Sequence, residues 1–537
     1  MSVRVREPLD VLITAGRIVD GTGNPWFRGD VGIRDGRIVA IGPLPGAQAA
    51  LVLDARDRVI APGFVDAHVH GDLALFMDPQ HEPAIRQGVT TYIIGQDGVA
   101  MAPASPAVLE YMCRYTAGFS GGAEWRRLPA EQRPTWSTID EYLNAFNGRT
   151  AVNVATLVPN GNVRMEVMGL ATRTPTPDEL TVMKRLVHEG MEQGAVGLSS
   201  GLDYIPSLYA QEAELAELCT AIAPYDGVYV THMRRYDPTG LEGSLGEVFR
   251  IGEHARCPVH VSHFNSQARL ALPLVDAARR RGIEVTYDLY CYLAGSSIVG
   301  MYTLPPWIQE GGLDATLTRL RERADWQRLC EAFANPKAPL ETVRISYVAD
   351  PAWRKYEGMS LLEAAGRGAS GEIDPARLGE FVCQILLASE MAVGCVVPHR
   401  FRDESDVRGL MCHPAMMGGS DGIYTGSRPH PRGCGCYARY LGHYVREGVW
   451  SLETAVQRLA AHPAQRFGLR DRGLLRVGLA ADVVVFDPDT ISDPATYEDG
   501  RKLAVGVDHV LVNGTVVLRD GQRTAALPGR GLRRGES

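Results

Sequence analysis

The stretch Gly63-Phe64-Val65-Asp66-Ala67-His68-Val69-His70-Gly71-Asp72 begins as a short apolar strand and ends in the pattern His-x-His. Side chains alternate between the two faces of a strand, so we expect His68 and His70 to point the same way. Imidazole is the commonest side-chain ligand of zinc-like metals in proteins. This stretch therefore predicts two metal ligands at the end of one strand.

Seven further strand-like runs follow, and amphipathic helical stretches such as 178–193 and 211–223 separate most of them. Eight strands that alternate with helices predict an α/β fold, the parallel (β/α)8 or TIM barrel. The predicted barrel strands are 64–70, 91–95, 152–159, 195–200, 228–232, 259–263, 284–290 and 416–421.

The segment between the seventh and eighth predicted strands is far too long for a single βα loop. It contains helical patterns at 313–334 and 360–366. We therefore predict an insertion after barrel strand 7, at about 298–414, that forms a lid over the barrel mouth.

Both ends of the chain are rich in β-forming residues and in turn signals. The Asp35-Gly36 and Asn513-Gly514 pairs each separate two apolar runs, which is typical of β-hairpins. Neither end has enough strands for a stable sheet of its own. We expect residues 1–62 and 477–537 to build one small, discontinuous β-sandwich, with the barrel domain 63–476 inserted between them.

Composition excludes several classes of protein. The 537 residues carry a formal net charge of -8 and no basic tract, which argues against a nucleic-acid partner. No run approaches the length of a membrane span, and Met1-Ser2-Val3-Arg4-Val5-Arg6-Glu7-Pro8 lacks the apolar core of a signal peptide. The ten cysteines form no CxxC pair. We expect reduced thiols in a cytoplasmic protein, without a membrane partner.

Ligand-type side chains stand at the ends of five predicted strands, where TIM barrels carry their catalytic groups. A lone histidine at a strand end is usually structural. Six ligand-type residues at the ends of five strands of one predicted barrel instead indicate a metal site. Asp97 also fits an ordinary turn, Gln96-Asp97-Gly98, and that alternative stays open. The predicted ligands of one or two divalent ions, with zinc expected, are His68, His70, Asp97, His232, His263 and Asp421.

Such a site predicts hydrolysis of a small-molecule substrate by metal-activated water. Asp421 could bind metal, take the proton of the water and pass it to a leaving nitrogen. A catalytically weak binding protein that kept the fold is the alternative of a different class. The four histidines and Asp421 argue against it, because a scaffold does not need them.

The chain resembles the amidohydrolase superfamily and, more closely, the N-acyl-D-amino-acid deacylases, or D-aminoacylases. The resemblance covers almost the whole chain and implies a barrel plus sandwich, zinc, and hydrolysis of the amide of an N-acylated, D-configured amino acid. Its motifs are residues 61–70, Gln87-Gly88-Val89-Thr90-Thr91, 197–202, Thr231-His232-Met233-Arg234, Val261-Ser262-His263, Gly419-Ser420-Asp421-Gly422, His430-Pro431-Arg432, 441–447 and 464–469.

Two departures concern the metal bridge. The resemblance to the superfamily implies a carbamylated lysine on strand four, but residues 194–200 contain no lysine. In the D-aminoacylase branch a bridging cysteine follows strand two, and here Asp97 takes its place in Gly95-Gln96-Asp97-Gly98. A carboxylate can still bridge two ions, although it is a harder ligand than sulfur.

A third departure concerns the substrate. The resemblance implies a lysine two residues after the strand-six histidine, as an anchor for the substrate carboxylate, and here the residue is Asn265. An amide cannot supply that charge-assisted bond. The segment Tyr290-Cys291-Tyr292-Leu293-Ala294-Gly295-Ser296-Ser297 resembles a family element, so Tyr292 and Ser296 are candidate substrate-binding residues. Packing of Tyr292 beneath the lid is the alternative. The lost lysine also keeps open a cyclic-amide, imide or lactone hydrolase on the same metal centre.

Overall fold

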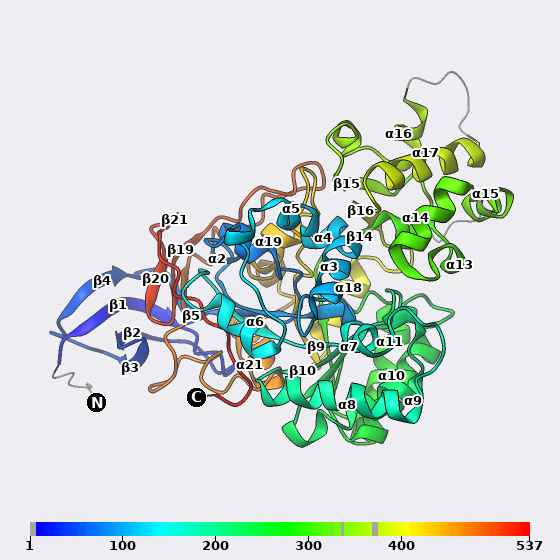
Figure 1. Ribbon diagram of the computed structural model, residues 1–537. Coiled ribbons are helices and arrows are strands. Elements are labelled where there is room, and N and C mark those ends of the chain that lie inside the picture. The colour runs from blue at the N-terminus through cyan, green and yellow to red at the C-terminus, as the bar shows by residue number, and fades with distance from the viewer. Residues whose placement is uncertain (1–6, 324, 335–337, 368–373, 537) are drawn as a thin grey trace.

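The computed structural model of the chain describes residues 7–323, 325–334, 338–367 and 374–536. Most of the N-terminal stretch that we interpreted as lacking a signal peptide, Met1–Arg6, lies outside these residues. Figure 1 shows three regions along the molecule: a sheet built from both chain ends, a central barrel, and an insertion at the far side of the barrel.

Eight parallel strands close into a barrel, so the predicted α/β barrel is confirmed. β8 and β9 are two parts of one strand, which pairs with β7 through its first part and with β10 through its second. The barrel closes where Ala67 N donates to Gly418 O at 3.2 Å. The strands are β6 (Phe64–Asp66), β7 (Val89–Ile94), β8 (Asn153–Thr156), β9 (Val158–Pro159), β10 (Gly197–Gly201), β11 (Val228–His232), β12 (Val259–Val261), β13 (Val285–Leu289) and β17 (Met416–Gly418).

The first barrel strand ends earlier than predicted. β6 stops at Asp66 because the carboxylate of this residue accepts hydrogen bonds from the backbone N of His68 and of Ser420, at 3.3 and 2.8 Å. His68 and His70 therefore lie just beyond the strand rather than within it. Their rings nevertheless stay on the same side, with centroids 5.4 Å apart.

Helices surround the barrel. The predicted helices at 178–193 and 211–223 are found as α8 and α9, and α8 begins with a capping box of Thr176 and Glu179. No helix in the described part of the chain combines the length and apolar character that crossing a bilayer requires. The main helices beside the barrel are α3 (Pro106–Tyr115), α6 (Ile139–Phe146), α7 (Asn160–Met168), α8 (Pro177–Glu192), α9 (Glu212–Cys219), α10 (Leu241–Ala255), α11 (Ala268–Arg280), α18 (Glu404–Cys412) and α19 (Arg432–Arg439).

The insertion between β13 and β17 has its own antiparallel sheet, of order β14-β16-β15, covered by helices (Figure 1). The sheet starts at Ala294, slightly before the predicted boundary. The helix predicted at 313–334 is two helices, because α14 ends at Glu322 and the next residue, Arg323, is in the left-handed conformation (φ 54°). Residue 324 and parts of 335–373 lie outside the described residues. The elements are β14 (Ala294–Ile298), β15 (Arg344–Val348), β16 (Val393–Pro398), α12 (Val299–Thr303), α13 (Pro306–Gln309), α14 (Gly312–Glu322), α15 (Trp326–Ala334), α16 (Leu361–Gly366) and α17 (Pro375–Ala388).

The two chain ends share one nine-stranded sheet, in which β18 from the C-terminal part pairs with β5 from the N-terminal part. The turns at Asp35-Gly36 and Asn513-Gly514 have positive φ at both residues, as two-residue hairpin turns require. Apolar side chains from both ends, including Ile13, Ile33 and Val485, form one buried cluster. The strands are β1 (Leu9–Ile18), β2 (Phe27–Arg34), β3 (Arg37–Gly42), β4 (Ala49–Asp54), β5 (Val59–Pro62), β18 (Val483–Phe486), β19 (Val507–Val512), β20 (Thr515–Arg519) and β21 (Gln522–Arg523).

Candidate metal centre

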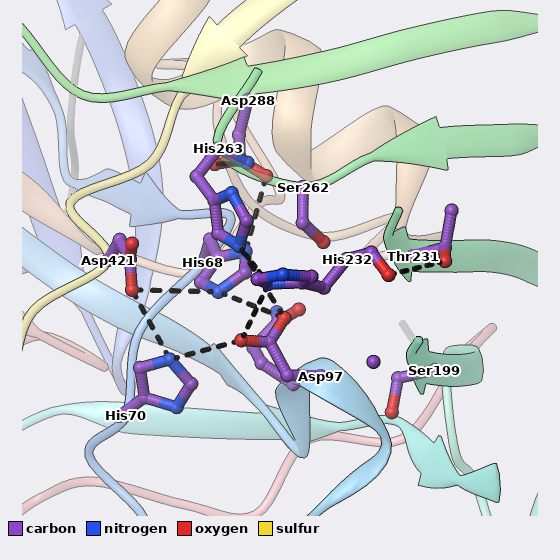
Figure 2. A network of polar contacts seen from close by, with 12 residues as sticks. His68, His70, Asp97, Ser199, Thr231, His232, Ser262, His263, Asp288 and Asp421 are labelled. Atoms are coloured by element: carbon purple, nitrogen blue, oxygen red, sulfur yellow. Dashed lines mark hydrogen bonds and ion pairs between the residues drawn. The ribbon is translucent and has the colours of Figure 1, made fainter. Parts of the chain in front are cut away.

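The six predicted ligand residues converge at the carboxyl ends of the barrel strands (Figure 2). Two groups of ligand atoms each lie within 4.8 Å of one another, and Asp97 belongs to both. The first group also contains His68 and His70, and the second contains His232 and His263. The arrangement suits one ion, or two ions that share Asp97.

The local backbone turns three of these residues into the site. Asp97, His263 and Asp421 follow β7, β12 and β17 and have left-handed φ values of 56°, 32° and 49°. A non-glycine residue in this conformation costs about 1–2 kcal/mol, and such strain clusters at functional sites. The surrounding structure therefore holds these side chains in orientations that relaxed loops would not favour.

Asp421 links the histidines to a buried arginine. Its Oδ1 lies 3.2 Å from His70 Nε2 and 3.8 Å from His68 Nε2. Its Oδ2 lies 2.8 Å from Nη1 of Arg432. Burial alone would raise the pKa of Asp421, but Arg432 and His70 outweigh it and lower that pKa to about 2. The carboxylate is therefore ionised at neutral pH.

The donor set fits a divalent cation. His68 Nε2 and Asp97 Oδ1 face each other at 3.7 Å, and both are buried without a hydrogen-bond partner. Buried polar atoms normally have partners, so these atoms indicate that a ligand belongs among them. Burial lowers the pKa of His68, yet the carboxylates of Asp288, Asp97 and Asp421 raise it overall to about 10. The carboxylates around His68 thus favour a positive charge at this point, and imidazole nitrogens and carboxylate oxygens are both ligands of zinc.

Asp288 on β13 supports the site, and the sequence analysis missed it. Its Oδ2 lies 3.3 Å from His68 Nδ1 and 3.0 Å from His260 Nε2, and its Oδ1 accepts from His263 N at 2.9 Å. A carboxylate on the far nitrogen of a ligand histidine fixes the tautomer and orientation of the ring. The available signal was an acidic residue inside the otherwise uncharged strand 285–289.

Three aromatic side chains cover the cluster. Phe119 packs on His70 at 4.8 Å between ring centroids, and Tyr204 and Tyr236 pack on His232 at 5.3 and 5.4 Å. Tyr204 also joins the insertion, because its hydroxyl lies 2.9 Å from that of Ser297. The least buried ligand side chain, that of His232, is only 14% exposed. The centre is therefore nearly closed to solvent.

The predicted substrate residues have different surroundings. Asn265 Nδ2 donates to the Tyr290 hydroxyl at 2.7 Å, close to the ligand loop of His263. The hydroxyl of Ser296 donates to Cys395 O at 2.8 Å, and that of Tyr292 donates to Asp493 Oδ2 at 3.0 Å. Asn265 Nδ2 and the hydroxyls of Ser296 and Tyr292 are therefore each engaged by another group of the protein.

The barrel, the inserted sheet and the histidine–aspartate cluster together define a metal-dependent hydrolase of the amidohydrolase type. The model of the Amidohydrolase family matches residues 51–355 and 357–518. Because these residues make up most of the chain, the protein belongs to the amidohydrolase family.

Individual relatives are similar over the whole chain. A D-aminoacylase of Alcaligenes xylosoxydans xylosoxydans is 33% identical over 99% of this chain and 99% of its own. The crystal structure of an N-acyl-D-glutamate deacylase from Bordetella bronchiseptica, with zinc and a phosphonate mimic of the tetrahedral intermediate, is 34% identical with a TM-score of 0.80. It matches 98% of this chain and 100% of its own. A D-aminoacylase with a binuclear metal centre is 31% identical, with a TM-score of 0.78 and the same coverage.

Proposed function

We propose that this chain, an amidohydrolase, hydrolyses the amide bond of an N-acylated, D-configured amino acid. The convergence of four imidazoles and two carboxylates at the barrel mouth carries the proposal. Full-length similarity to D-aminoacylase and to N-acyl-D-glutamate deacylase supports the substrate class.

We assign separate roles in the reaction to the side chains of the site. We assign His68, His70, His232, His263 and Asp421 as metal ligands, and Asp97 as a ligand or bridge. When bound, the ion supplies a water of lowered pKa and polarises the carbonyl oxygen of the substrate. Asp421 accepts the proton of the attacking water and returns it to the leaving nitrogen. A general base must lie within hydrogen-bond reach of that proton, and Oδ1 of Asp421 lies beside the ligand histidines.

Supporting residues hold this arrangement. Arg432 keeps Asp421 ionised and fixes one of its oxygens, so the other oxygen faces the histidines. Asp288 orients His68. We assign Asn265 to the substrate wall, because it follows His263 by two residues. We assign Tyr292 and Ser296 to the same wall, where their hydrogen bonds to Asp493 and Cys395 hold the start of the insertion in place.

The domain boundaries, the lid and the cellular location are also part of the proposal. We propose that residues 1–62 and 477–537 form a β-sandwich domain, that 63–476 form the barrel domain, and that the insertion at about 298–414 acts as a lid. The pairing of β5 with β18 supports the first assignment, and the contact between Tyr204 and Ser297 supports the last. All ten cysteines are free, which supports a reducing, cytoplasmic location.

A paired assay tests the proposed function. Purified protein is offered N-acetyl-D- and N-acetyl-L-amino acids and, as a comparison, a cyclic imide and a lactone, while zinc is measured on the same sample. We expect acetate release from the D-substrates and at least one divalent ion per chain. Ring opening without deacylation would replace the deacylase by the cyclic-amide or lactone alternative, and full activity without metal would contradict the mechanism.

A further inference from the structure

Arg402 is a buried cation with unused hydrogen-bonding capacity. It lies just after β16 in the insertion and is 6% exposed. Its Nη2 donates to the backbone carbonyl of Tyr290, at 3.3 Å, and to that of Tyr292. Its Nε and Nη1 are buried and have no hydrogen-bond partner.

The other buried arginines show that this is an exception. Arg164 pairs with Glu214, Arg432 with Asp421 and Arg472 with Asp482. Within the described part of the chain, Arg402 is the buried arginine that forms no ion pair with a carboxylate. An uncompensated buried charge is strongly unfavourable. Stacking on Tyr290, 5.3 Å from guanidinium to ring, offsets only part of that cost. The site therefore lacks an anion.

The surroundings connect Arg402 to the metal centre. The ring of Tyr290 contacts Arg402 and also Arg432, whose guanidinium lies 4.5 Å from the ring and bonds to Asp421. The hydroxyl of Tyr290 accepts from Asn265 Nδ2 and lies 2.9 Å from Nε2 of His399. Asn265 Oδ1 is also buried without a partner. Two residues that contact Tyr290, Arg402 at its ring and Asn265 at its hydroxyl, thus carry buried polar atoms without partners.

No neighbouring negative charge compensates Arg402 within the described part of the chain. Burial, followed by the charges of Arg402 and Arg432, lowers the pKa of His399 well below its usual value, so this ring is neutral. Burial also lowers the pKa of Arg402 from its ordinary value. Because Asp421 already compensates Arg432, one positive charge is left over beside Tyr290.

We propose that Arg402 is the cationic anchor for a carboxylate of the N-acyl substrate, in a chain that carries Asn265 where the family resemblance implies a lysine. The inference rests on the proposed function and specifies its substrate: an N-acylated amino acid with a free carboxylate. A guanidinium forms strong charge-assisted bonds with a carboxylate. The substrate carboxylate would supply the anion that Arg402 lacks.

The carboxylate could be the α-carboxylate or a side-chain carboxylate, and three substrates separate the two. N-acetyl-D-leucine carries only the α-carboxylate, N-acetyl-D-leucinamide carries none, and N-acetyl-D-isoglutamine carries only a side-chain carboxylate. The readout is kcat/KM for acetate release by the metal-loaded, full-length enzyme. We expect the wild type to prefer one of the two carboxylates over the neutral amide.

Arg402→Gln should reduce kcat/KM for the preferred carboxylate by about 10- to 100-fold, the usual range for a hydrogen bond to a charged group. Turnover of the neutral amide should change little, so the charge preference should disappear. Arg402→Lys should keep part of the preference. Asn265→Lys added to Arg402→Gln should restore part of it, because the second change returns a cation to the wall.

A matched control variant separates the loss of substrate anchoring from a loss of fold stability. Arg458 also donates to two backbone carbonyls, of Pro414 and Met416, and has a buried Nε without a partner. Arg458→Gln should lower the unfolding temperature without changing the charge preference. Metal content and the unfolding temperature are measured for every variant.

Two results would overturn the inference. One is a wild-type enzyme that hydrolyses N-acetyl-D-leucinamide as well as both carboxylates. The other is an Arg402→Gln variant that retains metal and the full wild-type charge preference. Either result leaves the deacylase assignment intact. A wild-type enzyme with full metal that releases acetate from none of the three substrates would contradict the proposed function itself, and the inference with it.

Discussion

Two buried clusters of charge in this molecule differ in how their polar atoms are used. At the junction of the barrel and the terminal sheet, Asp482 Oδ2 accepts from Asn153 Nδ2 at 3.0 Å and from Arg472, and its Oδ1 accepts from Asn513 N at 2.7 Å. Each oxygen has a donor. This cluster ties β8, β18 and the turn after β19 together, and we interpret it as structural.

At the barrel mouth the pattern is the opposite. The carboxylate of Asp97 lies 3.6–3.8 Å from nitrogens of four histidines, and several of the buried atoms have no hydrogen-bond partner. Burial of polar atoms occurs in both places, so burial does not identify function. The unused bonding capacity of converging atoms does, because a folded chain otherwise satisfies such groups.

The largest expected effect comes from removing a ligand at the mouth. His263→Ala or His232→Ala should lose metal and reduce turnover by about 1,000-fold or more, since a catalytic ion contributes several kcal/mol to the transition state. Metal analysis and steady-state kinetics on the same sample measure both effects. His254→Ala, at a surface histidine paired with Glu217, is the control and should change neither.

A substitution in the Asp482 cluster should instead change the stability of the fold. Arg472→Met leaves the buried carboxylate of Asp482 without its cation, which should lower the free energy of unfolding by about 3 kcal/mol. Urea unfolding measures this change, and metal content per folded chain should stay the same. Arg56→Met, at the exposed pair with Asp54, should leave the unfolding midpoint unchanged. Metal loss in Arg472→Met would remove the distinction between the two clusters.

Asp421→Asn tests chemistry at the mouth without removing an imidazole. The amide keeps the size of the side chain but accepts no proton, so turnover should fall by roughly 100-fold or more. Most of the metal should remain, because the histidines are intact. Single-turnover kinetics on metal-loaded protein are the measurement, and near wild-type turnover would show that another group accepts the proton.

Asp97 gives the smallest and most specific effect. Asp97→Ala should weaken metal affinity by about 10-fold or more, as for the loss of other groups that support metal sites. Asp97→Cys should retain part of that affinity, because a thiolate is also an anionic ligand. Competition with a chelator measures both variants. Unchanged affinity in Asp97→Ala would make Asp97 an ordinary turn residue, and the two groups of ligands would then share no member.

The sequence predicted the barrel because each strand is an apolar run that ends in polar residues. It also predicted the residues that the structure brings together at the mouth, since carboxyl ends of parallel strands share one edge. It overestimated the length of the first strand. The side chain of Asp66 ends the strand by bonding to the backbone of His68 and Ser420, and only the folded chain brings Ser420 close.

Residues whose role depends on distant contacts were not predictable. Asp288 looks like one polar residue in a buried strand until His68 and His260 are placed beside it. Arg402 contacts Tyr290 only because the insertion folds back on the end of β13. The hydrogen bond from the Tyr292 hydroxyl to Asp493 also joins residues far apart in the sequence, and the substrate contact of Tyr292 stays a prediction.

The pairing of β5 with β18 also has a consequence for synthesis. Pro62 pairs with Val483, roughly 420 residues later, and at about 5–20 residues per second a ribosome needs roughly 20–80 s to make that stretch. Throughout this interval β5, whose four residues are all buried in the finished protein, has an open edge. Unpaired edges template aggregation. We therefore expect the nascent chain to depend on chaperones, and truncations that remove β18 to aggregate even when the barrel sequence is complete.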